Sequence, residues 1–149
     1  MKATELRVNN LVHFGLSNIV RVESINTHTC ICKAKYSRSG KDVFEDMISF
    51  SGDTASGNAP IESFWGIPLT EEILLKCGFS YRNCPPCGQD QWANMGIWSL
   101  ILPSGTYLTL RGGIKDIKVI YPHGTAILYL HQLQNLYFAL SGQELEVNL

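Results

Sequence analysis

The most constraining feature of the sequence is an apolar helix face near its C-terminus. Leu133, Leu136, Tyr137 and Leu140 recur at the spacing i, i+3, i+4 and i+7, which places them on one side of a helix. Gly142 follows at a position where a left-handed glycine commonly ends a helix. We therefore predict a packed C-terminal helix that completes the core.

The tail after this helix, Leu145–Leu149, alternates apolar and polar residues. This pattern predicts a short strand or an extended tail. Such a tail could add to the sheet of a second copy of the chain, so the sequence leaves a homodimer open.

A short central helix is predicted within residues 67–79. Thr70 is a good N-cap, and the acids Glu71 and Glu72 complement the positive end of the helix dipole. Gly78 can end the helix in a left-handed turn. Because a helix of this length is marginal in water, packing must stabilise it.

In most of the remaining chain, short β-prone runs separated by turn-forming residues predict antiparallel strands. The first runs form an N-terminal meander of the SH3-like barrel type, and the later runs form a second antiparallel sheet. The fold class expected is therefore α+β, mostly antiparallel β with a short central helix and a packed C-terminal helix. The expected strands span residues 11–14, 19–22, 29–34, 43–50, 96–102, 107–110, 116–121 and 125–130.

Length and composition set the class of protein. A chain of 149 residues is long enough for one domain with a real core and short for two, so we predict a single domain over residues 1–149. Residues 51–60 are small and polar and are expected to form a flexible loop. The net charge of −1 argues against a general nucleic-acid binder.

The expected compartment is the cytoplasm of a host cell. No run of apolar residues is long enough to span a membrane, and the N-terminus lacks the apolar core of a signal peptide. In that compartment the five cysteines are more often thiols or metal ligands than disulfides.

Two cysteines form the sharpest chemical feature. Cys84 and Cys87 have the CxxC spacing of half a structural zinc site, although an unligated surface turn is the more common outcome. Cys30 and Cys32 could supply the other two ligands, because alternate strand residues face the same side. Further candidates for completing the site are Cys77, His28, His123 and His131. Redox activity is disfavoured by the two prolines between the cysteines and the lack of a preceding strand.

A basic cluster and a tryptophan are the candidate partner contacts. Lys33, Lys35, Arg38 and Lys41 could bind a nucleic-acid backbone, a nucleotide phosphate or an acidic protein surface. Alternatively, the lysines protect a solvated edge strand. Trp92 lies in a polar stretch and is the preferred aromatic anchor for a partner.

A second tryptophan, Trp98, lies within a predicted strand and is expected in the core. No nucleophile elbow, zinc-protease helix or phosphate-binding loop occurs in the sequence, so no enzymatic activity is predicted.

Three segments, residues 1–12, 66–79 and 131–145, are similar to a family of small uncharacterised proteins from Bacteroidales bacteria, their prophages and phages. The shared motifs resemble GIPLTEExLLKxGF and HQLQNLYFALxGxEL. Residues 25–64 and 80–95 are not covered by the resemblance. It implies a mobile-element context and no catalytic residues.

The expected function is that of a non-enzymatic binding protein from a phage or mobile element. It would occupy a host protein, such as an immune nuclease, and so inhibit host defence. One alternative is a small-ligand sponge that binds a signalling nucleotide through Lys33, Lys35 or Arg38. Another is a small zinc-stabilised nucleic-acid-binding module.

Overall fold

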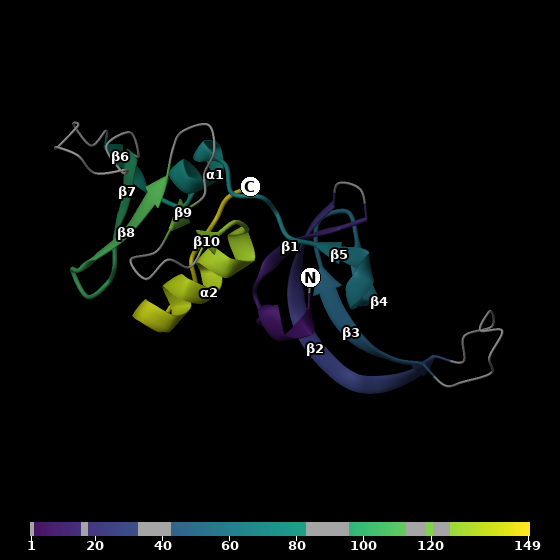
Figure 1. Ribbon diagram of the computed structural model, residues 1–149. Helices are drawn as coiled ribbons and strands as arrows, with labels where there is room; N and C mark the ends of the chain where they lie inside the picture. The colour runs from purple at the N-terminus through teal and green to yellow at the C-terminus, as the bar shows by residue number, and fades with distance from the viewer. Residues whose placement is uncertain (1, 16–17, 33–42, 83–95, 113–118, 121–125) are drawn as a thin grey trace. The chain divides into compact units, whose positions relative to one another are not determined.

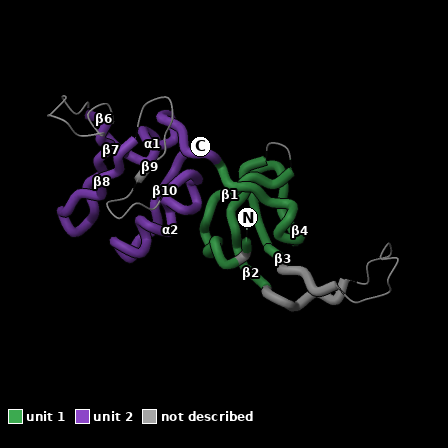
Figure 2. Tube along the Cα trace, in the orientation of Figure 1, with its two compact units in different colours: residues 1–67 green, residues 68–149 purple. Residues whose placement is uncertain are grey.

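The computed structural model describes residues 2–15, 18–32, 43–82, 96–112, 119–120 and 126–149 (Figure 1). The chain divides into two compact units, Met1–Ile67 and Pro68–Leu149 (Figure 2). Each unit contains an antiparallel sheet, and the predicted α+β class is confirmed. The single domain predicted for residues 1–149 stays a prediction.

The first unit is an antiparallel meander whose last strand returns to its first. In chain order its elements are η1 (Ala3–Glu5), β1 (Leu11–Phe14), β2 (Asn18–Cys32), β3 (Val43–Ser51), β4 (Ser56–Pro60), η2 (Ile61–Ser63) and β5 (Phe64–Trp65). The strands lie in the order β4-β3-β2-β1-β5, and β5 pairs with β1 directly after the 3-10 helix η2. This connectivity agrees with the SH3-like meander expected from the sequence.

Two details of this unit differ from the sequence prediction. The strands expected at residues 19–22 and 29–34 belong to one strand, β2, which runs from Asn18 to Cys32. Register irregularities against β3 occur in two places within β2 and accommodate the turn-forming residues without breaking the strand. Residues 51–60, predicted as a loop, contain β4, because Ser56–Pro60 pairs with β3 along its length.

The core of the first unit is built from side chains of all five strands of its sheet. Three phenylalanines from β1, β3 and β5 pack there: the ring centroids of Phe14 and Phe50 are 4.4 Å apart, and those of Phe50 and Phe64 are 5.3 Å apart. The buried Asn10 closes the turn into β1, because its Oδ1 accepts the backbone N–H of Arg7 at 2.8 Å. Val8 and Asn9 form the turn itself.

In its described residues, the second unit has two helices and a sheet in the order β10-β9-β8-β7-β6. Its elements are α1 (Glu71–Lys76), β6 (Ser80–Arg82), β7 (Gly96–Ile101), β8 (Tyr107–Gly112), β9 (Val119–Ile120), β10 (Ala126–Ile127) and α2 (Leu130–Ser141). The predicted β7 and β8 are confirmed. β9 and β10 have two residues each. Residues 116–118 and 121 of the strand predicted at 116–121, and residue 125 of the strand predicted at 125–130, lie outside the described residues, whereas Leu130 already belongs to α2.

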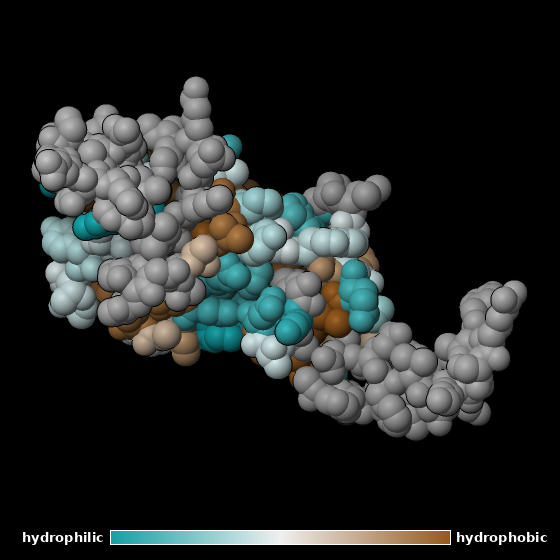
Figure 3. Space-filling model, in the orientation of Figure 1, coloured by the Kyte–Doolittle hydropathy of each residue, from teal (hydrophilic) through white to brown (hydrophobic). Residues whose placement is uncertain are grey.

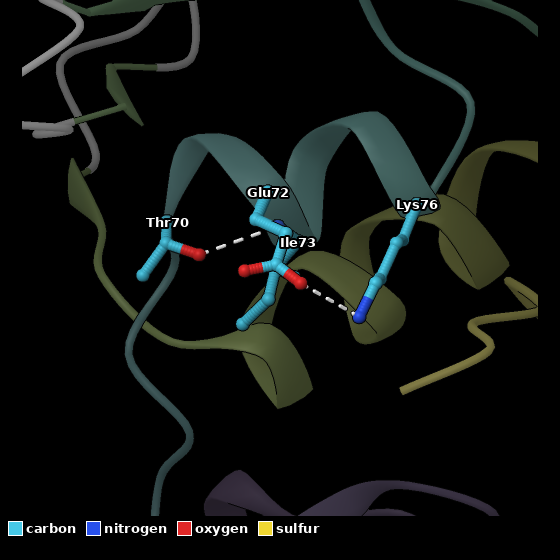
Figure 4. Close-up of polar contacts among 4 residues, drawn as sticks. All are labelled: Thr70, Glu72, Ile73 and Lys76. Atoms are coloured by element: carbon cyan, nitrogen blue, oxygen red, sulfur yellow. Dashed lines mark hydrogen bonds and ion pairs between the residues drawn. The ribbon is translucent and has the colours of Figure 1, made fainter.

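The central helix α1 is bounded by local hydrogen bonds at both ends, and Figure 4 shows the one at its N-terminus. The hydroxyl oxygen of Thr70 accepts the backbone N–H of Ile73 at 3.2 Å. At the other end Gly78 has a φ of +84°, and the backbone N–H of Phe79 donates to the carbonyl of Leu74 at 3.0 Å. This is a Schellman ending, which satisfies the last carbonyls of the helix.

Removing the cap of α1 gives a first testable prediction. We expect Thr70→Ala to lower the free energy of unfolding by about 1 kcal/mol, because the N–H of Ile73 loses its acceptor. Urea unfolding followed by circular dichroism measures this loss. Thr70→Ser keeps the hydroxyl and should stay close to the unsubstituted protein. A similar loss for both variants would contradict a capping role.

A glycine in β7 gives a second prediction. A methyl group at Gly96 would overlap the ring of Tyr81, which packs on Trp98 with ring centroids 4.8 Å apart. We expect Gly96→Ala to cost about 1–3 kcal/mol of stability, since the ring must move. Urea unfolding of Gly96→Ala in the Tyr81→Ala background should show a smaller penalty. An equal penalty in both backgrounds would rule out this steric cause.

The C-terminal helix α2 is confirmed, but its predicted apolar face is only partly buried. Leu133 is fully buried, whereas Leu136 and Tyr137 are half-buried and Leu140 is 42 % exposed. Burial is concentrated in the first turns of the helix, where Leu130 is also fully buried. Position along the helix therefore matters as much as the face on which a residue lies.

The ends of α2 are also built from local contacts. The Gln132 side-chain oxygen accepts the backbone N–H groups of Leu128 and Tyr129 at 2.8 and 3.2 Å, which is half of a capping box. Gly142 has a φ of +70°, and its N–H donates to the carbonyl of Phe138 at 2.8 Å. The tail from Leu145 onward forms no strand, so of the two predicted forms only the extended tail remains.

Candidate functional site

Most residues proposed from the sequence as a site lie outside the described residues. Those outside are Lys33, Lys35, Arg38, Lys41, Cys84, Cys87 and Trp92. Cys30 and Cys32 belong to β2, where they pair with Glu45 and Val43 of β3, and only their backbone is described. The zinc site and the basic patch therefore stay predictions.

The other cysteine considered as a ligand, Cys77, is a buried free thiol at the end of α1. Burial raises the pKa of this thiol from 9.0 to about 12, so it stays protonated at neutral pH. A protonated thiol is a poor nucleophile and a poor metal ligand. Within the parts of the chain that the structure describes, no three His, Cys, Asp or Glu side chains are grouped to hold a metal ion.

The burial of Cys77 gives a third prediction. At pH 8 the native protein should alkylate slowly at Cys77 with iodoacetamide, and the protein unfolded in urea should alkylate there rapidly. Peptide mass spectrometry measures the modification at this cysteine. Fast alkylation of the native protein would contradict the assigned environment.

The raised pKa of the folded thiol also implies that the free energy of unfolding falls as the pH rises from 9.0 towards 12, because the thiol ionises first in the unfolded chain.

His131, the other described candidate, is 1 % exposed at the start of α2. Its ring stacks on Tyr129, with centroids 5.7 Å apart and planes 12° apart. A histidine enclosed in this way has no access to a substrate in solution, so we assign it to packing.

The clearest candidate site in the described residues is the outer face of the first sheet. Alternate residues of β1 point inward: Val12 and Phe14 contact the core, and their cross-strand partners Val20 and Phe64 are buried with them. The residues between them must face outward. His13 of β1 therefore lies on the outer face, where it pairs with Ile19 of β2 on one side and Trp65 of β5 on the other.

This cross-strand row, together with Arg21, is called the Trp65 surface below. The side chain of Trp65 is 51 % exposed and that of Ile19 is 37 % exposed, although both are large and apolar. Arg21 lies two residues beyond Ile19 on the same face, and its guanidinium donates to the carbonyl of Asn9 at 3.4 Å. Directly opposed side chains in a sheet have Cβ atoms about 5 Å apart, so the row is continuous.

The central His13 makes the row amphipathic. Its Nδ1 atom is shielded from solvent and has no hydrogen-bond partner in the described part of the chain. Tryptophan and arginine are among the side chains that carry most of the binding energy in protein interfaces. Hydrophobic residues reach the surface in separate areas among hydrophilic ones on the face drawn in Figure 3.

Comparisons of the chain with protein-family models, with curated proteins and with solved structures give no match. Among the described residues, no helix combines the length and the apolar character needed to cross a bilayer.

Proposed function

We propose that this protein is a non-enzymatic binding protein of a phage or mobile element and that it occupies a host protein through the Trp65 surface. The observation that carries the proposal is the half-exposed Trp65 in a row with His13 and Ile19, beside Arg21. An exposed tryptophan offers a large, rigid contact area at a low cost in conformational entropy.

The kind of partner follows from the sequence context. The motifs that resemble proteins of Bacteroidales bacteria, their prophages and phages support a partner from such a cell. Occupying a defence protein, such as an immune nuclease, would give a small mobile-element protein an inhibitory role without chemistry of its own. The protonated Cys77 and the enclosed His131 support a binding role, because neither is suited to catalysis.

Affinity capture from a Bacteroidales lysate tests this proposal. The tagged protein should retain a specific host protein that Trp65→Ser does not retain. The matched control is Ile101→Ser, which removes a 62 % exposed apolar side chain from β7 in the other unit. The control should capture the same protein as the unsubstituted chain. Equal capture by both variants, or capture of no specific protein, would contradict the proposal.

A further inference from the structure

A second exposed surface lies on the outer face of the sheet in the second unit. Trp98 of β7 pairs with Leu110 of β8, and both are completely buried on the inner face. The neighbouring residues in each strand must face the other side. One outer row runs from Arg82 of β6 across Ile97 of β7 to Arg111 of β8.

The described strands of this outer face carry positive charge. Arg82 and Arg111 are exposed, and β6, β7 and β8 contain no Asp or Glu. Neither guanidinium has an ion-pair partner among the residues that the structure describes. Adjacent strands are about 4.8 Å apart, so the two Cα atoms are separated by about 10 Å across the sheet.

The same face also carries hydroxyl groups and an aromatic ring. Ser99 and Thr109 pair directly and are half-buried beside the arginine row. Tyr107 lies four residues from Arg111 along β8, which is about 14 Å, and its side chain is 66 % exposed. Tyr107 pairs directly with Ile101, which is 62 % exposed, so this end of the face has an exposed ring beside an apolar side chain. Cations at one end of the face and an exposed ring at the other match a nucleic-acid strand, which has both phosphates and bases.

We propose that this face binds single-stranded nucleic acid. Arg82 and Arg111 contact phosphates, the hydroxyls of Ser99 and Thr109 donate to backbone oxygens, and a base stacks on Tyr107. The ring favours nucleic acid over an acidic peptide, because glutamate and aspartate side chains gain nothing from stacking. With a net charge of −1 on the whole chain, binding should be modest and strongly dependent on salt.

Fluorescence anisotropy with the full-length protein and a labelled single strand of about 12 nucleotides tests this proposal. Two phosphate contacts predict that log K falls against log[salt] with a slope of about −1.4. The double variant Arg82→Gln, Arg111→Gln should bind at least about tenfold more weakly at low salt and lose most of this slope. Tyr107→Ser should weaken binding by about tenfold, whereas Tyr107→Phe keeps the ring and the affinity.

Lys2→Glu is the matched control, because it changes the net charge by as much as the double variant at an exposed position of the other unit. It should bind like the unsubstituted protein. The proposal is overturned if no binding occurs at low salt, or if the double variant binds normally. Equal affinity for a poly-glutamate peptide would assign the face to acidic protein segments. An unchanged affinity of Tyr107→Ser would assign it to phosphate alone.

Discussion

Trp98→Ala is expected to lower the free energy of unfolding by about 3–5 kcal/mol. Trp98 is completely buried in β7 and packs on Tyr81, with ring centroids 4.8 Å apart. Truncation removes the largest of the fully buried side chains and leaves a cavity that the two neighbouring strands cannot close. A loss of this size is a large fraction of the stability of a small protein.

Urea unfolding followed by circular dichroism measures this loss of stability. Two further variants test whether it comes from the burial of Trp98. Ile101→Ala is the matched control, because Ile101 lies on the same strand but is 62 % exposed, and we expect a change below about 1 kcal/mol. Trp98→Phe should cost less than Trp98→Ala. It also removes an Nε1–H that has no acceptor among the described residues. Equal losses for Trp98→Ala and Ile101→Ala would contradict the assignment of Trp98 to the core.

The features predicted correctly from the sequence are those set by neighbouring residues. The cap at Thr70 and the glycine ending at Gly78 depend on hydrogen bonds within one helical turn, and both are present. The position of Trp98 in the core follows from the alternation of β7, which is six residues long. Local chemistry and strand periodicity are therefore sufficient for these elements.

The features that differ from the prediction depend on distant parts of the chain. Turn-forming residues near Asn26 stay within β2, because β3 pairs with the strand on both sides of the irregularity. The polar run before Pro60 becomes β4 through pairing with the same strand, β3. Leu140 is exposed because the buried part of α2 ends before it. None of these partners can be identified from residues close in the sequence.

The candidate site could not be predicted from the sequence for the same reason. β5 has only two residues, Phe64 and Trp65, which give no alternation to indicate which of them faces outward. The pairing of Trp65 with His13 across β1 settles it, and that pairing joins residues far apart in the chain. Trp92, the tryptophan preferred from its polar surroundings, lies outside the described residues.

Trp65→Ser is expected to weaken partner binding by at least about 30-fold, which corresponds to about 2 kcal/mol of binding free energy. The half-exposed ring lies in a cross-strand row with His13 and Ile19. Because the ring contributes little to the core, the free energy of unfolding should change by less than about 1 kcal/mol. A loss of binding would then report on contact rather than on misfolding.

The most direct test of the Trp65 surface is therefore the dissociation constant of the captured host protein, measured by isothermal titration calorimetry with three purified proteins. The unsubstituted chain and Ile101→Ser should bind with the same dissociation constant, and Trp65→Ser should raise it at least about 30-fold. A dissociation constant that is the same for all three proteins would contradict a role for Trp65 in binding the partner.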